Sequence, residues 1–294
     1  NTLEPLLSFS IIRKYLEERF GIKKASERIL TVTEEESTGA LEALSQSQAY
    51  KQFFIPKDIG GRYSLFTAAS ILPLFLAGHN VSEVLEGANS LFNSLSEERD
   101  HPVFKAAAAR KVAWETGKRV EAFAYSETRL AGYVEWLKQL FGESEGKNSK
   151  GLLPTSLSYS TDLHSLGQYL QEGYPSILES FIEVANPKQR SSDYCEKTLF
   201  TVKEGLESTS LKAFAGKSLN FANQLARDAA KQAHFERGVP CLSYKIPDLT
   251  PFSLGYLSAS FQLICALSAL MVDLNPFDQP GVEAYKVQMK KSLF

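Results

Sequence analysis

Hydrophobic residues recur at helical spacing near the start of the chain, and short runs rich in β-branched and aromatic residues interrupt that spacing. The apolar pattern predicts helices over 3–20, 38–47 and 65–76. Short apolar runs at 29–33 and 51–56 predict buried strands between them. On the first helix, one face carries Leu3, Leu6, Leu7, Ile11, Tyr15 and Leu16. Because helices alternate with strands, we predict parallel sheets with helices on both faces.

The same alternation resumes after a helical middle section over 81–118. A strand over 120–125 begins a second region of mixed helix and strand. Its remaining elements are predicted helices over 130–141, 163–171, 211–234 and 254–274, strands over 176–184 and 240–246, and a tail helix over 282–293. We therefore predict an α/β protein divided into residues 1–100, 101–274 and a tail, 275–294. In such sheets ligands bind beyond the carboxyl ends of the strands, so glycine-bearing loops there are the first place to look.

The longest apolar run, 254–274, is long enough to cross a membrane. Polar side chains interrupt it at Ser258, Ser260, Gln262 and Ser268, and no one-sided cluster of basic residues flanks it. We interpret this run as a helix buried between the layers of a soluble domain.

Composition narrows the class of protein. The 294 residues are 44% hydrophobic and 22% charged, with a formal charge of −2, and basic residues are balanced along the chain by acidic ones. A broad basic face for nucleic acid is therefore not expected. Cys195, Cys241 and Cys265 lie far apart without metal-ligand spacing. We predict reduced thiols, a cytoplasmic location, and neither metal nor cofactor.

The start of the chain shows neither an initiator methionine nor a basic, apolar leader. We expect the chain to be part of a longer one.

Two glycine-bearing segments hold candidate chemical groups. The sequence GESEGK at 142–147 follows an apolar helix, and Glu143 is either a solvated loop acid or a base at the edge of a cleft. The sequence Gly60-Gly61-Arg62 lies between a strand and a helix. It forms either an anion site with a fixed cation or a simple turn with a solvated arginine.

A histidine and a lysine extend this set. His164 follows Thr161 and Asp162, either of which is an N-cap, so it is predicted in a first helical turn that disfavours the imidazolium. Lys286 follows a sharp break at 275–281. Taken alone, His164 is equally a surface histidine, and Lys286 is a solvent-facing lysine. Together, a carboxylate, an arginine, a histidine and a lysine suit proton transfer beside a carbonyl group.

Four segments together resemble the glucose-6-phosphate isomerase family, in its bacterial form. They read GGRYS at 60–64, GESEGK at 142–147, DLHSLGQYLQEG at 162–173 and NPFDQPGVEAYK at 275–286. The resemblance implies two sugar isomerase (SIS) domains, the first only partly present. It also implies interconversion of glucose 6-phosphate and fructose 6-phosphate in glycolysis and gluconeogenesis.

The resemblance also implies roles for individual residues. Glu143 corresponds to the base that moves a proton between the first two carbons, and Arg62 to the cation that steadies the cis-enediolate. His164 and Lys286 correspond to the ring-opening pair. Substrate-binding positions are Thr2, Gly61 and Gln279. Glu145 has no implied role, and we expect its side chain to be solvated.

In this family the histidine reaches the site from a neighbouring subunit, so the resemblance implies a homodimer. We expect Glu143 to lie near Arg62, and His164 to lie far from Glu143 of the same chain. The main phosphate-binding loops of the family would precede residue 1, and only Thr2 matches the end of one. We therefore expect little isomerase activity from this chain alone.

Other readings remain open at this point. One is a non-catalytic SIS-type protein that binds sugar phosphates, or an inactive fragment. The other is a metal-dependent sugar isomerase of a different fold, which the absence of a His/Asp/Glu ligand cluster in the sequence disfavours.

Overall fold

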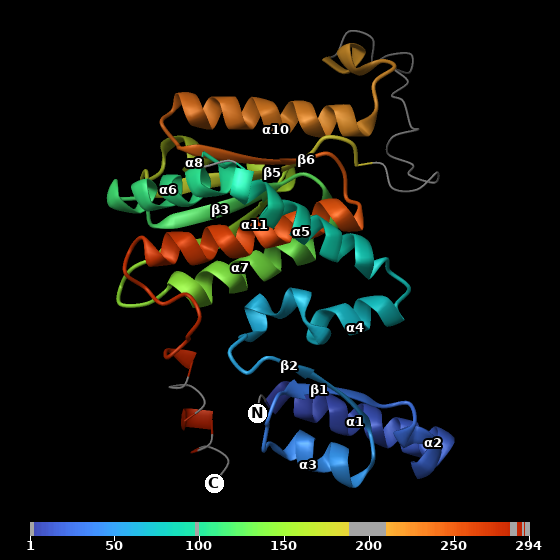
Figure 1. Ribbon diagram of the computed structural model, residues 1–294. Coiled ribbons are helices and arrows are strands. Elements are labelled where there is room, and N and C mark those ends of the chain that lie inside the picture. The colour runs from blue at the N-terminus through green and yellow to red at the C-terminus, as the bar shows by residue number, and fades with distance from the viewer. Residues whose placement is uncertain (1–2, 98–99, 188–209, 283–286, 290, 292–294) are drawn as a thin grey trace. The chain divides into compact units, whose positions relative to one another are not determined.

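A computed structural model of the chain describes residues 3–97, 100–187, 210–282, 287–289 and 291 (Figure 1). The chain forms two compact units, Asn1–Val81 and Ser82–Phe294. This division comes earlier than the boundary predicted near residue 100. The difference arises because helix α5, Val81–Glu97, packs directly against helix α11, Pro251–Leu270, of the second unit.

The first unit contains a two-stranded parallel sheet and short helices. Strands β1 and β2 run side by side, with Leu30 opposite Lys51 and Glu34 opposite Ile55. The elements are α1 Leu3–Phe20, α2 Ile22–Ser26, β1 Leu30–Glu34, α3 Ala40–Ser47, β2 Lys51–Ile55, the 3-10 helix η1 Gly61–Phe66, and α4 Ala68–Leu76. Both predicted strands and the first two predicted helices are therefore confirmed.

The inward face of α1 differs from the predicted one. Leu7 and Ile11 belong to the predicted apolar face, but their exposed fractions are 55% and 71%. The ring of Phe9 instead lies in contact with that of Tyr50. The partly buried stripe recurs every three or four residues at Leu6, Phe9, Arg13, Leu16 and Phe20. Leu6 and Leu16 of the predicted face are thus partly buried, whereas Leu7 and Ile11 are exposed.

The second unit is a four-stranded parallel sheet in the order β4-β3-β5-β6. Helix α10 lies on one side of this sheet, and α7 and α11 lie on the other (Figure 1). Besides α5 and α11, its elements are α6 Pro102–Glu115, β3 Val120–Tyr125, η2 Thr128–Leu130, α7 Ala131–Glu145, β4 Leu153–Ser158, η3 Thr161–Leu163, α8 Gly167–Glu172, β5 Ile177–Val184, η4 Ser210–Phe214, α10 Leu219–Glu236 and β6 Cys241–Ile246. The α/β fold with helices on both faces of a parallel sheet is confirmed.

Strand β4 is the element that the apolar pattern did not predict. It carries Pro154 and two serines, so it lacks the β-branched run that marks a strand. Proline is tolerated there because β4 lies at the edge of the sheet and pairs only with β3 among the described strands.

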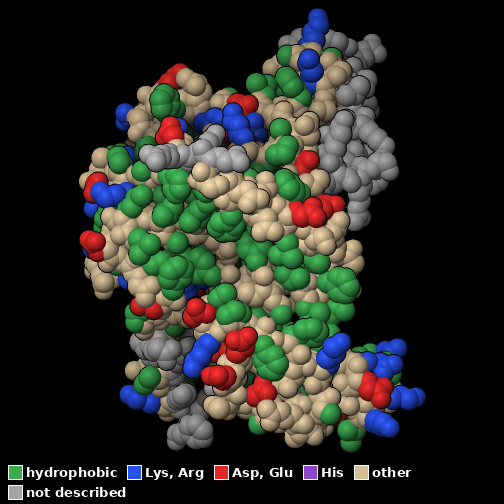
Figure 2. Space-filling view, in the orientation of Figure 1, with side chains coloured by type: hydrophobic (Ala, Val, Ile, Leu, Met, Phe, Trp, Pro, Cys, Tyr) green, Lys and Arg blue, Asp and Glu red, His purple; other side chains and the backbone are tan. Residues whose placement is uncertain are grey.

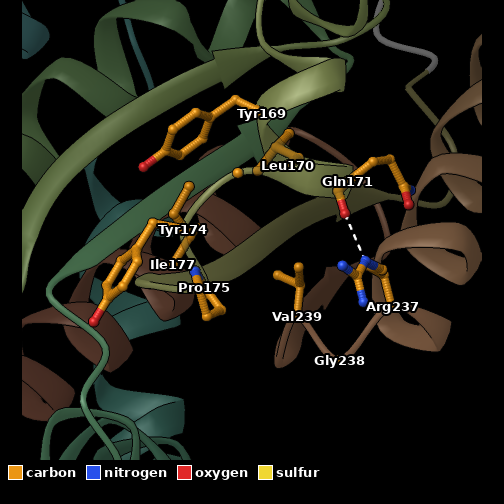
Figure 3. Close-up of a pocket in the computed structure, with 10 residues that line it drawn as sticks. Tyr169, Leu170, Gln171, Tyr174, Pro175, Ile177, Arg237, Gly238 and Val239 are labelled. Atoms are coloured by element: carbon orange, nitrogen blue, oxygen red, sulfur yellow. Dashed lines mark hydrogen bonds between the residues drawn. The ribbon is translucent and has the colours of Figure 1, made fainter.

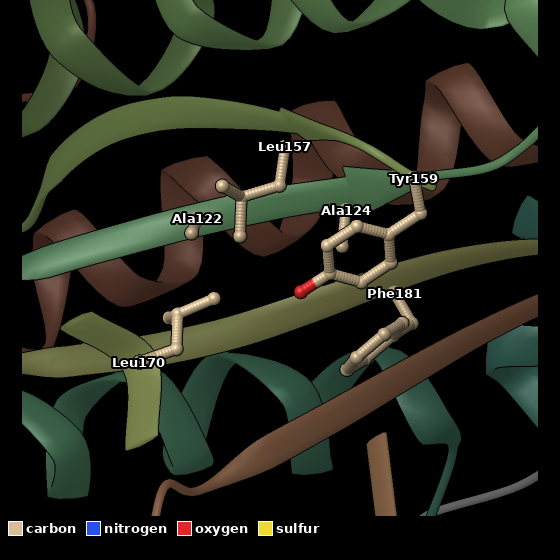
Figure 4. Packing of buried hydrophobic residues seen from close by; sticks show 6 residues of the cluster. All are labelled: Ala122, Ala124, Leu157, Tyr159, Leu170 and Phe181. Carbon is tan, nitrogen blue, oxygen red and sulfur yellow. The ribbon is translucent and has the colours of Figure 1, made fainter. Parts of the chain in front are cut away.

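Side chains of the sheet alternate between two cores. Figure 4 shows Ala122 and Ala124 of β3 with Leu157, Tyr159, Leu170 and Phe181, the core beneath α8 and α10. On the opposite face, Phe123 lies between the rings of Phe141 and Phe261, with centroid distances of 5.3 and 6.0 Å. Each fully buried phenylalanine of this kind stabilises the fold by roughly 2–3 kcal/mol.

Buried acids on β5 fix α10 to the sheet. The Glu179 carboxylate lies 2.8 Å from Nδ1 of His234 and also accepts from the Tyr159 hydroxyl. The Glu183 carboxylate accepts from Nζ of Lys231 at 2.6 Å. Burial opposes ionisation of Glu183, but bonds from Lys231 and Ser243 and the Arg227 charge outweigh it and lower its pKa.

Helix α11 is long and apolar enough to cross a membrane by length and composition, yet 61% of its apolar window is buried inside the structure. This burial agrees with its interpretation as a core helix. On the face drawn in Figure 2, Lys and Arg side chains lie among acidic ones, and hydrophobic side chains gather over the second unit. The described residues of this face therefore form no broad basic surface.

Helices α5 and α11 approach so closely that glycine is required on both. A Cβ atom on Gly255 would lie 2.0 Å from the carbonyl oxygen of Val84, and one on Gly87 would lie 2.0 Å from that of Phe252. We predict that Gly255→Ala lowers the free energy of unfolding by about 1–3 kcal/mol, because the helices must separate.

The matched control is Gly132→Ala in α7, where a Cβ atom would meet nothing within 4 Å. It should raise stability by up to about 1 kcal/mol through helix propensity. Urea unfolding of the three proteins measures both values. Equal stability of Gly255→Ala and the parent would contradict the close approach.

Candidate active site

Glu143 lies in the last turn of helix α7 and not in a loop. The predicted helix ended at Phe141, but the structure continues it to Glu145, with Gly146 as its C-cap. Gly142 does not end the helix because it packs against β4: a Cβ atom there would lie 3.4 Å from Cγ of Pro154. The expected flexible glycine loop around Glu143 is therefore corrected to a helical turn.

The Glu143 side chain lies on the outer side of α7 and is half-buried. Nε2 of Gln139, one turn earlier, donates to its Oε1 at 3.3 Å. The buried residues of this helix are Val134, Leu137, Leu140, Phe141, Ser144 and Glu145. At 100° per residue, position 143 lies beside that stripe, about 60° from Leu140, which agrees with its half-buried state.

Glu145 is buried, contrary to the expectation of a solvated side chain. Only 3% of the residue is exposed, and its Oε2 accepts from Nη2 of Arg110 at 2.7 Å. Its Oε1 accepts from the hydroxyl of Ser268 on α11. Burial raises the pKa of Glu145, and the Arg110 charge and the Ser268 bond only partly offset that rise. The acidic residue next to the candidate base thus belongs to the core.

Lys147 ties the end of α7 to the segment 275–278. Its Nζ donates to the carbonyl oxygens of Asn275 and Asp278 and lies 2.5 Å from Oδ1 of Asp278. The Lys147 side chain is 10% exposed and the Asp278 side chain is 53% exposed, so only the lysine is largely shielded from water. The structure therefore brings two of the sequence motifs together, and Gln279 follows directly after the bound segment with its side chain exposed.

His164 lies between η3 and α8 and is exposed. It was predicted in the first turn of a helix, but α8 begins only at Gly167. The carboxylate of Asp162 organises this loop, because it accepts from the backbone amide of Ser158 at 2.6 Å and from the Ser165 hydroxyl. Asp162 was predicted as a possible N-cap, but its carboxylate makes these two bonds instead. The 3-10 helix η3 ends here, with His164 as its C-cap.

Glu143 and His164 lie near opposite ends of strand β4. The turn of Glu143 contacts Pro154 at the start of β4, whereas the His164 loop is bonded to Ser158 at its end. These two positions are separated by about 13 Å of strand. The candidate base thus lies near the amino ends of the strands. This corrects the expectation of a site beyond their carboxyl ends. That His164 serves the Glu143 of a partner subunit stays a prediction.

The remaining predicted residues have different outcomes. Gly61 and Arg62 begin η1 of the first unit, where Gly61 is exposed and Arg62 is buried, with its guanidinium 5.5 Å from the ring of Tyr63. Thr2 and Lys286 lie outside the described residues. The nearness of Arg62 to Glu143 stays a prediction.

A cavity of about 290 Å³ lies at the amino ends of β5 and β6, between the C-terminal ends of α8 and α10 (Figure 3). Nε of Arg237 donates to the carbonyl oxygen of Gln171 beside it, at 2.8 Å. Its lining comes from α8, the start of β5 and the loops 173–175 and 237–239, and so it is separate from the turn of Glu143. Among the described residues, no group of three or more His, Cys, Asp or Glu is arranged to hold a metal ion.

Comparison with known proteins decides the family. The sequence profile of phosphoglucose isomerase matches residues 47–293, which include Arg62, Glu143, His164 and Gln279. The chain belongs to the phosphoglucose isomerase family. It is 41% identical over 293 residues to a glucose-6-phosphate isomerase of Clostridium tetani, covering 98% of this chain and 63% of that protein. It is 40% identical over 290 residues to one of Bacillus cereus, covering 98% of this chain and 62% of that protein. The chain thus spans under two thirds of these relatives.

Two solved structures share the fold of this chain. A hypothetical protein from Thermus thermophilus is similar with a TM-score of 0.88 and 26% identity, covering 99% of this chain and 69% of that chain. A glucose-6-phosphate isomerase from Chlamydia trachomatis is similar with a TM-score of 0.75 and 19% identity, covering 100% of this chain and 57% of that one. The second similarity supports the fold alone.

We predict that Lys147→Met loosens the segment 275–279, because it removes the cation that three oxygens share. Chymotrypsin should then cleave after Phe277, which is 53% exposed, about tenfold faster. The control is Lys138→Met, which removes an exposed pair with Glu135 on the same helix and should leave the rate unchanged. Equal cleavage of Lys147→Met and the parent would mean that other contacts hold the segment.

Proposed function

We propose that the chain carries the proton-transfer machinery of an aldose-ketose isomerase that interconverts glucose 6-phosphate and fructose 6-phosphate. The family supports this reaction, and one observation carries its assignment to a site. Lys147 joins the turn that bears Glu143 to the segment that leads into Gln279. A base and a substrate-binding amide are thereby held on neighbouring pieces of chain.

In the proposed reaction Glu143 removes the proton from C2 of the open-chain aldose and returns it to C1. The intermediate is a cis-enediolate, whose negative charge Arg62 balances. His164 and Lys286 act earlier, when they move protons to open the sugar ring. Thr2, Gly61 and Gln279 contact the substrate. The accessible, helically held carboxylate of Glu143 suits a base that must address two adjacent carbons.

The sharpest test uses a chimera in which this chain replaces the matched region of the Clostridium tetani relative, since the match covers 63% of that protein. In the chimera, Glu143→Gln should lower kcat by roughly two to four orders of magnitude, the usual scale for a positioned base. KM should change little, because the amide keeps the shape of the carboxylate. The matched control is Glu135→Gln, the same change at a 63%-exposed acid two turns earlier on α7, which should leave kcat unchanged. Retained turnover in Glu143→Gln would assign the base to another residue. A chimera that binds the sugar phosphate without turnover would favour a non-catalytic binding protein.

We further propose a homodimer in which His164 of one subunit serves Glu143 of the other. The separation of the two residues at opposite ends of β4 supports this arrangement. A two-fold axis allows each subunit to complete the site of its partner.

Subunit mixing tests this arrangement. Glu143→Gln and His164→Ala chimeras should each be nearly inactive. After both are unfolded together and refolded, mixed dimers should contain one intact site of two, which restores about one quarter of the parental activity at random pairing. No recovery in a mixture shown to contain mixed dimers would place both residues in a site within one subunit.

A further inference from the structure

The last turn of α7 is held from the inside by a buried ionic cluster, formed by Arg110, Glu121 and Glu145. Nη2 of Arg110 lies 2.7 Å from Oε2 of Glu145 and 3.0 Å from Oε2 of Glu121. The exposed fractions of the three side chains are 1%, 0% and 4%. A serine hydroxyl donates to each carboxylate, Ser268 to Glu145 and Ser180 to Glu121. The cluster thus joins α6, β3, α7, β5 and α11.

The carboxylate of Glu145 in this cluster destabilises helix α7. A carboxylate in the last turn opposes the helix dipole, and Glu145 occupies that turn. Replacing a buried ion pair by apolar residues is often neutral or stabilising, so stability by itself does not account for a charge there. Nε and Nη1 of Arg110 have no hydrogen-bond partner among the described residues, and the guanidinium lies 4.0 Å from the ring centroid of Phe141. Both carboxylates of the cluster are therefore held by the same atom, Nη2 of Arg110.

The chain after Glu145 closes over this residue. A Cβ atom on Gly151 would lie 2.4 Å from the carbonyl oxygen of Glu145, and one on Gly146 would lie 2.6 Å from that of Gly142. The backbone on either side of Glu145 therefore has little space to shift. Buried bonds hold its side chain, and close backbone contacts hold its main chain.

We propose that Arg110 and Glu145 are positioning residues for the Glu143 carboxylate. Glu143 and Glu145 are two residues apart in one helical turn, so their side chains leave the helix in opposite directions. Fixing Glu145 in the core thus fixes the direction in which Glu143 points outward. This inference rests on the proposed function, because it takes Glu143 to be the base.

Hydrogen exchange of this chain tests the clamp without any assay of activity. In Glu145→Ala, the amides of residues 142–147 should exchange about 10- to 100-fold faster, because the turn opens locally. In Glu145→Gln they should stay close to the parent, since the amide can accept from Arg110 and donate to Ser268. The matched control is Glu183→Ala, which breaks a buried pair on the other face of the sheet and should leave these amides unchanged. Parental exchange in Glu145→Ala would overturn the proposal.

Kinetics of the chimera separate positioning from stability. Glu145→Ala should lower kcat about 10- to 100-fold with KM within about twofold, because a base displaced by about 1 Å loses that much rate. Glu145→Gln should recover most of kcat, and Glu183→Ala should leave it unchanged. Faster exchange with an unchanged kcat would overturn the positioning role while leaving the clamp. Parental turnover in Glu143→Gln would instead overturn the proposed function, and the two failures are thereby distinguished.

Discussion

The buried ion pairs of Arg110 with Glu121 and Glu145 are the interaction on which the second unit depends. The Arg110 guanidinium projects from α6 and meets carboxylates from β3 and α7, so one cation connects the sheet to two of its covering helices. In a low-dielectric interior such attractions are strong, and leaving any partner alone is correspondingly costly. The ring of Phe141 lies against the Arg110 guanidinium and packs in turn against the rings of Phe123 and Phe261. Charge and apolar packing therefore fix the same end of α7.

The direction of the strands arranges the candidate site. Each helix runs antiparallel to the strand before it. The C-terminal end of α7 therefore lies near the amino ends of the strands, and the loop after β4 lies at their carboxyl ends. Glu143 and His164 are consequently kept apart by the fold itself. Near Glu143, Lys147 binds the segment before Gln279 to the end of α7, although more than 120 residues of sequence separate them.

Much of the fold was predictable from local pattern. Strand β3 was predicted with the observed bounds, and β5 and β6 within one residue, because each carries a short run rich in apolar and aromatic residues. Strand β4 was missed because Pro154 and its serines are tolerated only through its edge position, which is a property of the assembled sheet. The role of Glu145 was missed for a similar reason. Its partner Arg110 lies 35 residues away, and no spacing rule connects them.

By itself, the sequence determined the α/β class and the family, because strand and helix periodicity and short motifs are local properties that a residue carries with it. Only the tertiary structure decided that the segment after Phe141 stays helical, that Glu145 turns inward and that Glu143 turns outward. Those outcomes depend on Pro154, Ser268 and Arg110, which reach α7 from other elements. A glycine next to two glutamates favours a solvated loop in isolation. Burial against an arginine reverses that preference, because the cation compensates the carboxylate only where the sheet and helices bring them together.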